Sequence, residues 1–308
     1  MNIGITGIIT NEINEILLIQ RDDTRSWALP GGSLDQGEAP DAGVAREVQE
    51  ETGLKVMPVR LVGIVYRGIS NREHLQFIFR CMQSGGELQT SSESLQVNYF
   101  KRRKLPRPIF SFHRDIMELG WHHAGEAIWK KMRFPWEHIP RWLWLKLVVY
   151  PRLKREREKN GEPAYVPPPS WSLSVRLIIA SPNGRSDSDR ANGEIGHVWI
   201  KVRDWCLLPG GLSEPGALPW EEAKRIAKEQ LGGDVELKRI AGAYVDPDEA
   251  HLTLVWEAAL SPTDIQNGNL TVVSHDANEP INPFHREIVA ATLSRPDLVH
   301  FQIPVSSR

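Results

Sequence analysis

Cysteine is scarce in this chain of 308 residues, and long apolar runs are missing from it. The two cysteines, Cys81 and Cys206, lie far apart and have no CxxC or Cys/His spacing, so neither a zinc site nor a disulfide framework is expected. No apolar run approaches the roughly 20 residues that a membrane-spanning helix needs. The opening residues MNIGITGIIT also lack the basic segment of a secretory signal. A cytoplasmic location is therefore the default expectation.

An excess of charge of one sign is also missing. The 37 Lys and Arg residues are nearly balanced by 39 Asp and Glu, which gives a formal net charge of -2. Such a chain has no global basic field to attract nucleic acid, and it contains no helix-turn-helix pattern. Hydrophobic residues make up 41% and charged residues 25%, values typical of globular domains. No nucleic-acid partner is expected.

Three sequence patterns occur twice, in the same order. ILLIQRD and WALPGG (16–32) are echoed by VWIKVRD and WCLLPGG (198–211), HLQFIF (74–79) by HLTLVW (251–256), and FHRDI (112–116) by FHREI (284–288). Ordered echoes of this kind indicate two homologous domains. We place these domains at 1–120 and 171–308. The connecting segment, 121–170, ends in the proline-rich GEPAYVPPPS, which is typical of an extended linker.

Apolar, β-branched segments alternate with helical patterns in the first copy. Residues 39–53, bounded by Pro40 and Gly53, have the pattern of a helix, and a second helix is expected near 112–120. The expected strands are 4–10, 15–21, 61–67 and 74–81. This order predicts a sheet covered by helices on its faces, and the second copy repeats it.

Three carboxylates are expected on one face of the first helix. Glu47, Glu50 and Glu51 stand at positions i, i+3 and i+4, where like charges repel one another. A hard divalent cation such as magnesium or manganese would compensate that repulsion. The alternative is a solvated acidic face stabilised by nearby basic residues, of which Arg46 is the nearest. Upstream, Pro30-Gly31-Gly32 forms a turn whose backbone can approach a ligand closely.

The combined spacing from Gly32 to Leu54, G-x5-E-x7-R-E-V-x-E-E-x-G-L, resembles the signature of the Nudix hydrolases at every fixed position. The resemblance implies an α/β fold, here two α/β/α sandwich domains, each with a mixed β-sheet flanked by helices. It also implies a magnesium-dependent hydrolase, with manganese as a possible substitute. Such an enzyme cleaves a phosphoanhydride (pyrophosphate) bond in a nucleoside diphosphate derivative such as ADP-ribose, so a small nucleotide is the expected partner.

The resemblance also assigns roles by position. Glu50 and Glu51 correspond to metal ligands, and the carbonyl of Gly31 is a weaker candidate ligand. Glu47 corresponds either to a ligand or to the general base, and Glu93 on a later loop is the alternative base.

Two further positions, Glu38 and Arg46, correspond to a supporting pair, in which the guanidinium orients a carboxylate and keeps the loop docked on the helix.

The second copy lacks most of these carboxylates. Its counterparts of Glu38, Arg46, Glu47, Glu50 and Glu51 are Ala217, Arg225, Ile226, Glu229 and Gln230. One remaining carboxylate does not assemble a magnesium site, so we expect a degenerate, non-catalytic domain. The alternative for the whole chain is a nucleotide-sensing regulatory module with little turnover.

Residues 129–157 are rich in Trp, Lys and Arg. A basic, Trp-rich helix could lie on a membrane surface. A helix clamped between the two domains is the favoured interpretation, because exposed Trp is costly in solution.

Overall fold

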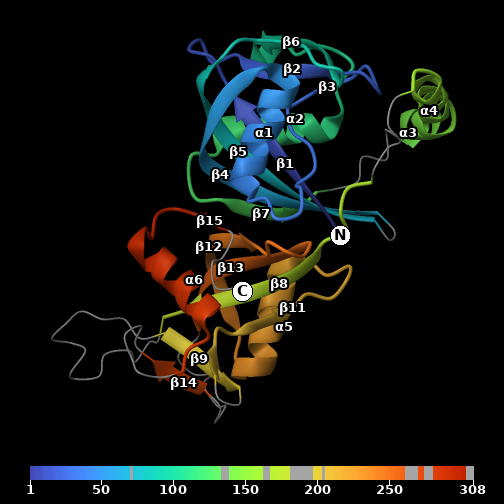
Figure 1. The fold of residues 1–308 in the computed structure, drawn as a ribbon. Helices are drawn as coiled ribbons and strands as arrows, with labels where there is room; N and C mark the ends of the chain where they lie inside the picture. The colour runs from blue at the N-terminus through green and yellow to red at the C-terminus, as the bar shows by residue number, and fades with distance from the viewer. Residues whose placement is uncertain are drawn as a thin grey trace. The chain divides into compact units, whose positions relative to one another are not determined.

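The chain divides into two compact units in the computed structural model (Figure 1). The N-terminal unit contains Asn2–Asp35 and Pro40–Pro169, and the C-terminal unit contains Ser170–Arg308 together with Met1 and Gln36–Ala39. The structure describes residues 1–69, 72–132, 139–161, 167–180, 197–202, 205–260, 270–273 and 280–302.

A mixed four-stranded sheet forms the centre of the N-terminal unit, in the order β1-β5-β4-β7. Its strands are β1 (Asn2–Ile9), β5 (Arg72–Gly86), β4 (Leu54–Ile69) and β7 (Ile128–Lys131). β1 runs parallel to β5, β4 antiparallel to β5, and β7 parallel to β4. A second, antiparallel sheet is ordered β3-β2-β6, from β3 (Trp27–Ala28), β2 (Ile16–Arg21) and β6 (Ser94–Phe100).

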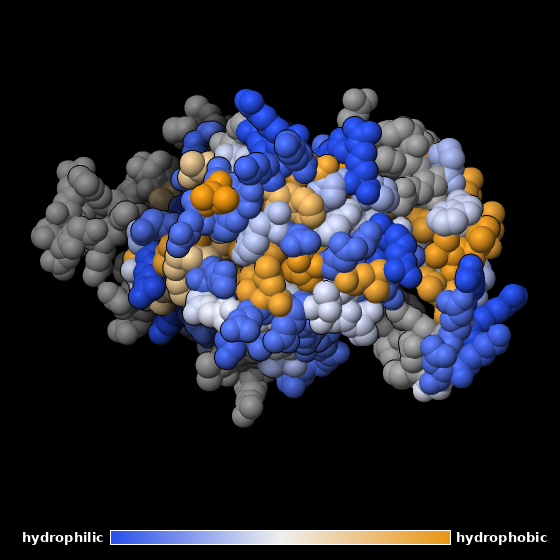
Figure 2. Space-filling view, turned by 90° about the horizontal axis from the view of Figure 1, so that it is seen from above, coloured by the Kyte–Doolittle hydropathy of each residue, from blue (hydrophilic) through white to orange (hydrophobic). Residues whose placement is uncertain are grey.

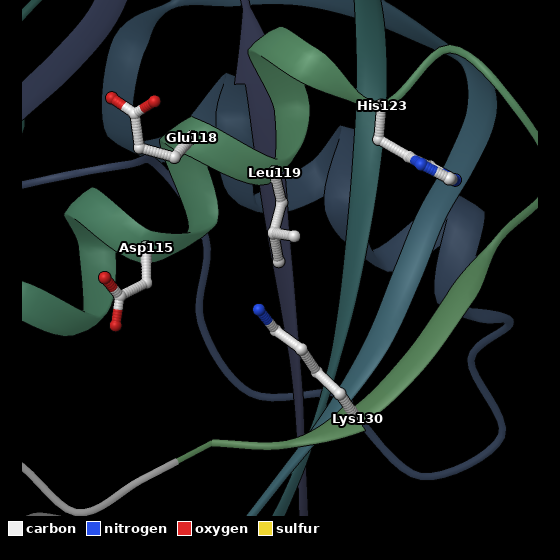
Figure 3. Close-up of a pocket in the computed structure, with 5 residues that line it drawn as sticks. All are labelled: Asp115, Glu118, Leu119, His123 and Lys130. Carbon is white, nitrogen blue, oxygen red and sulfur yellow. The ribbon is translucent and has the colours of Figure 1, made fainter.

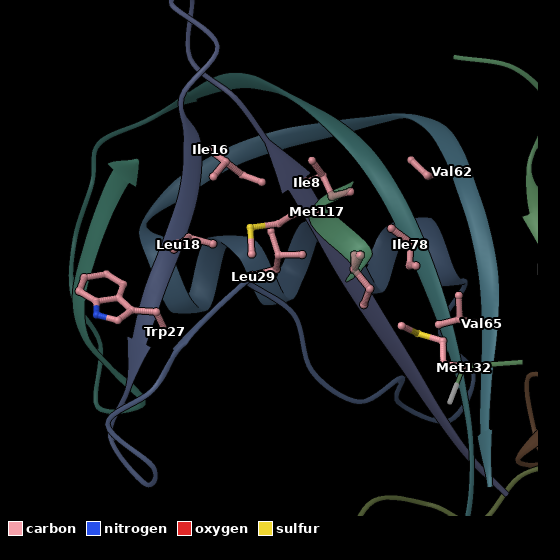
Figure 4. Close-up of a cluster of buried hydrophobic side chains, with 11 residues drawn as sticks. Ile8, Ile16, Leu18, Trp27, Leu29, Val62, Val65, Ile78, Met117 and Met132 are labelled. Atoms are coloured by element: carbon pink, nitrogen blue, oxygen red, sulfur yellow. The ribbon is translucent and has the colours of Figure 1, made fainter. Parts of the chain in front are cut away.

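Two helices cover opposite faces of the main sheet of this unit. Gly7 of β1 lies against Val44 and Val48 of α1 (Pro40–Thr52), whereas the next residue, Ile8, lies against Gly120 of α2 (Ser111–His122). Successive residues of a strand point to opposite faces, so the sheet lies between α1 and α2. Figure 4 shows the core on the α2 side, where Ile8 and Leu18 pack with Met117.

The ends of α1 follow from its sequence. Pro40 is its first residue, where a fixed φ and a missing N–H cost nothing. Gly53 has φ +75°, the left-handed conformation that ends a helix. The predicted helix from Pro40 to Gly53 is therefore confirmed to within a residue.

The C-terminal unit repeats this topology. Its main sheet has the order β11-β8-β13-β12-β15, in which β8 and β13 are parallel, β12 and β13 antiparallel, and β12 and β15 parallel. A smaller antiparallel sheet is ordered β10-β9-β14. The elements are β8 (Ser172–Ile179), β9 (His197–Val202), β10 (Trp205–Leu207), β11 (Gly210–Leu212), α5 (Pro219–Leu231), β12 (Val235–Val245), β13 (His251–Leu260), β14 (Leu270–Val273), α6 (Pro283–Ser294) and β15 (His300–Gln302). The prediction of mixed sheets flanked by helices is confirmed.

Residues 139–159 of the connecting region form a helical segment. It consists of α3 (Ile139–Trp144), a π-helical turn η3 (Leu145–Val149) and α4 (Tyr150–Lys159). Leu147 is 69% exposed and Trp144 52% exposed, and basic residues follow in α4. Hydrophobic and hydrophilic side chains also adjoin one another on the surface in Figure 2. In the part of the chain that the structure describes, no helix is long and apolar enough to cross a membrane. The favoured interpretation, a helix clamped between the domains, stays a prediction, and contact with a membrane surface stays its alternative.

Candidate active site

The glycine turn of the N-terminal unit is held against the first strand. The N–H of Gly7 donates to the carbonyl of Pro30 at 2.9 Å, and the N–H of Ile5 donates to the carbonyl of Gly32 at 3.0 Å. Between them, Gly31 has φ +144°, and a Cβ there would collide with the backbone of β1. The Gly31 carbonyl accepts no hydrogen bond from the residues that the structure describes.

Glu51 is buried directly beside this turn. It is 5% exposed, and its Oε2 accepts a hydrogen bond from the Gly31 N–H at 2.8 Å. Burial raises the pKa of Glu51 to about 8, although the Gly31 hydrogen bond opposes the change. Within the described ranges this carboxylate forms no ion pair. A buried carboxylate that pairs directly with no cation of the described residues is costly, so this position fits a further positive charge.

Arg46 links the other carboxylates of α1 to the loop before it. Its Nη1 lies 3.1 Å from Glu47 Oε1 and 3.2 Å from Glu50 Oε2, and its Nη2 lies 3.6 Å from Asp35 Oδ2. Nη2 also donates to the Ser33 carbonyl at 3.3 Å. These contacts join the loop to the helix, and the supporting role of Arg46 in the site stays a prediction. Its predicted pairing with Glu38 stays a prediction.

Glu47 and Glu50 differ in burial. The side chain of Glu50 is 59% exposed, whereas that of Glu47 is 15% exposed and lies against Gly32, where a Cβ would collide with the carboxylate. Burial raises the pKa of Glu47, and the charge of Arg46 opposes that change. The α1 carboxylates thus have one buried, one half-buried and one exposed member around the same turn.

The loop before β6 brings a fourth carboxylate to this region. The hydroxyl of Ser94 donates to the Glu51 carbonyl, and the negative charge of neighbouring Glu93 contributes to the raised pKa of both Glu47 and Glu51. Glu93, the alternative base in sequence, therefore lies close enough to the α1 carboxylates for its charge to act on them.

Two charged residues of the site were not predicted from the sequence. Asp35 contacts Arg46, as described above, and Arg21 lies close enough for its charge to act on Glu51. Arg21 is itself paired with Asp23 at 2.9 Å. The recurrence of Arg-Asp at the end of the ILLIQRD and VWIKVRD patterns was the available signal for Arg21.

In the C-terminal unit the equivalent glycine turn contacts a glutamine in place of Glu51. The N–H of Gly210 donates to Gln230 Oε1 at 2.9 Å, and Gln230 Nε2 donates back to the Gly210 carbonyl at 3.0 Å. Arg225 bonds Glu229 and lies 3.7 Å from Glu214, the counterparts of Glu50 and Asp35. Ile226, which stands where the first copy has Glu47, is 5% exposed. The arginine clamp is thus common to both units, although Arg225 also bonds Glu222, which is buried and has Gly43 as its counterpart. The carboxylates at the positions of Glu47 and Glu51 are not retained.

The recurring histidines have a structural role in both units. His113 Nδ1 accepts the N–H of Leu29 at 3.4 Å, and His285 Nδ1 accepts the N–H of Leu208 at 2.9 Å. Each bond ties the helix α2 or α6 to the segment just before the glycine turn. Both histidines therefore dock a helix on the strand-loop segment before the turn.

A surface hollow of about 370 Å³ lies elsewhere, between α2 and β7 (Figure 3). Asp115, Glu118 and Leu119 of α2, together with His123 and Lys130, line it. None of the site residues expected from the sequence is among them.

Comparison with known proteins places the chain in a family. The NUDIX domain model matches residues 2–120. A MutT-like protein of Streptomyces ambofaciens is 43% identical over 98 residues, which are 32% of this chain and 62% of that protein. The 8-oxo-dGDP phosphatase NUDT18 of Mus musculus is 38% identical over 132 residues, 40% of each chain. This chain therefore spans less than two thirds of both relatives. An ADP-ribose pyrophosphatase of Methanocaldococcus jannaschii is 31% identical over 128 residues, 40% of this chain and 75% of that protein. The chain belongs to the Nudix hydrolase family.

Proposed function

We propose that the N-terminal unit is a Mg²⁺-dependent hydrolase that cleaves a phosphoanhydride bond in a nucleoside diphosphate derivative. The observation that carries this proposal is the Glu51 carboxylate, which is buried beside the Gly31 turn without an ion-pair partner among the described residues. Glu47 and Glu50 adjoin it on the same helix face.

The donor set fits a hard divalent ion. Glu50, Glu51 and Glu47 would supply anionic oxygens, and the Gly31 carbonyl would supply a neutral one. Oxygen ligands of this kind are those that Mg²⁺ and Mn²⁺ prefer. When bound, such an ion neutralises phosphoryl oxygens and lowers the pKa of an attached water.

The remaining chemistry falls to the chain's own side chains. A half-buried Glu47 with a raised pKa is suited to accept the proton of the attacking water, and Glu93 is the alternative base. Arg46 holds Glu47 and Glu50 in place through its two short contacts, so it is a positioning residue. Glu38 is proposed to support the same loop.

The C-terminal unit is proposed to be a degenerate Nudix-like domain without catalysis. Its topology matches that of the N-terminal unit, yet Ile226 and Gln230 replace two of the α1 carboxylates. Because the C-terminal unit keeps the fold without the carboxylates, the alternative to an enzyme is a nucleotide sensor with little turnover.

Turnover tests the proposal and separates it from the alternative. The full chain is incubated with Mg²⁺ and a panel of ADP-ribose, 8-oxo-dGDP, nucleoside triphosphates and dinucleotides. Released nucleoside monophosphate and phosphate are then measured. The names of the relatives, an ADP-ribose pyrophosphatase and an 8-oxo-dGDP phosphatase, favour the diphosphate compounds as substrates. Nucleotide binding without turnover under Mg²⁺ or Mn²⁺ would refute the enzyme and support the sensor.

A further inference from the structure

The two glycine turns are built alike. Gly31 and Gly210 have φ values of +144° and +150°, and each turn lies beside the first long strand of its unit. Each glycine donates its N–H to a side chain near the end of the following helix, to Glu51 at 2.8 Å and to Gln230 at 2.9 Å. Residues 51 and 230 therefore accept a hydrogen bond from the same backbone N–H of the turn in both units.

The second polar atom of this side chain differs between Glu51 and Gln230. In the C-terminal unit it is the Gln230 amide nitrogen, which donates to the Gly210 carbonyl at 3.0 Å and closes a ring of two hydrogen bonds. In the N-terminal unit it is a carboxylate oxygen, which has no hydrogen to donate to the Gly31 carbonyl. The Gly31 carbonyl accepts no hydrogen bond from the described residues, so a cation or a proton is needed to satisfy it.

Two contacts around the closed turn are preserved, and Arg225 gains a further one with the buried Glu222. Arg225 still bonds Glu229 and approaches Glu214, as Arg46 does with Glu50 and Asp35. Ile226 lies 3.5 Å from the position of a Cβ on Gly211, so an apolar side chain packs where Glu47 lies against Gly32. The loss of carboxylates has not altered how this helix and turn meet.

We propose that the Gln230 carboxamide takes the place of a bound cation in the C-terminal unit. It joins turn and helix by hydrogen bonds within the chain, so this unit needs no metal ion for that contact. It also closes a slot, formed by the Gly210 carbonyl and residue 230, that a Glu at position 230 would open to a divalent ion. The inference rests on the proposed function of the N-terminal unit, where the equivalent slot holds Mg²⁺.

Metal uptake by the full-length chain tests this inference without reference to activity. Mn²⁺ binding is measured by electron paramagnetic resonance and calorimetry for wild type and Gln230→Glu. The variant is expected to bind one further Mn²⁺. Without metal its melting temperature should fall by about 3 °C or more, because a half-buried hydrogen bond is lost, and Mn²⁺ should restore it. Glu221→Gln, which changes an exposed glutamate in the first turn of α5, is the matched control and should change neither quantity.

The reciprocal variant covers the case in which Gln230→Glu does not fold. Glu51→Gln should close the N-terminal slot, so it is expected to raise the metal-free melting temperature and to abolish Mn²⁺ uptake. A lower metal-free melting temperature for Glu51→Gln would overturn the inference. So would an unchanged Mn²⁺ stoichiometry in folded Gln230→Glu. Failure of the wild type to bind any Mn²⁺ would instead refute the proposed function.

Discussion

Glu50 and Glu51 are neighbours in sequence but lie in different environments. Glu51 is buried against the Gly31 turn, whereas Glu50 is mostly exposed and is held by Arg46. If both ligate Mg²⁺, either Glu50→Gln or Glu51→Gln should lower turnover by at least about 100-fold while the fold persists. Steady-state assays across a Mg²⁺ titration, with circular dichroism as the fold control, check this. Full activity of either variant at saturating Mg²⁺ would contradict its assignment as a ligand.

His285 should make the C-terminal unit sensitive to acid. Burial lowers the pKa of His285 to about 3, below its ordinary value of 6.5, and its Nδ1 accepts the Leu208 N–H. Between these values the unfolded chain binds a proton that the native state does not, so stability is lost as pH falls below about 6.5.

The variant His285→Asn keeps a side-chain acceptor but does not titrate. The wild type should lose about 1–3 kcal/mol more free energy of unfolding than this variant between pH 7 and pH 4.5. Urea unfolding at both pH values measures the difference. Equal losses in the two proteins would show that His285 is free to take up a proton in the native state.

At the scale of elements, an arginine clamp joins helix to loop in both units. Lysine has one ammonium group and cannot span the separate contacts of a guanidinium. Arg46→Lys should therefore lower turnover by about 10-fold or more, because Glu47 and Glu50 lose their common partner. Arg225→Lys changes the matching clamp of the C-terminal unit and is the control. Similar losses of turnover in both variants would show that the clamp acts on folding alone.

The local sequence pattern was sufficient to predict which helices and strands surround the site, but not where each strand begins and ends. The helix of residues 40–53 was predictable because proline and glycine mark both ends. The sequence placed a strand at 61–67, whereas β4 begins at Leu54 and contains Pro58. The register shifts between Pro58 and Arg60, so the missing N–H of proline falls at an irregularity in the ladder. A pattern of alternating residues does not reveal such an irregularity.

The carboxylates of the site were predictable from spacing, whereas their environments were not. Three glutamates on one helix face follow from helical periodicity. The burial of Glu51, the exposure of Glu50 and the contact of Asp35 with Arg46 depend on how loop and helix pack. Likewise, Gln230 is recognisable in sequence as a lost carboxylate, but its second hydrogen bond is visible only in three dimensions.

The whole molecule combines two units of similar topology, in which the C-terminal main sheet has the additional edge strand β11, and of unequal chemistry. Glu47, Glu50 and Glu51 in α1 correspond to a single carboxylate, Glu229, in α5. Glu229→Gln should therefore leave turnover within about twofold of wild type, since an exposed helix residue contributes little. It is assayed beside Glu50→Gln with a Mn²⁺ titration. Loss of turnover in Glu229→Gln with activity spared in Glu50→Gln would assign catalysis to the other unit.

The hydrogen-bonded ring between Gln230 and Gly210 also has an evolutionary consequence. Glutamine and glutamate codons differ by a single base, so the slot could reopen in one mutational step. An isoleucine codon at 226 needs more than one change to encode glutamate. Descendants of this chain could therefore regain a cation in the C-terminal unit long before they regained a carboxylate at position 226. Selection on metal binding and selection on hydrolysis would then act on this unit at different times.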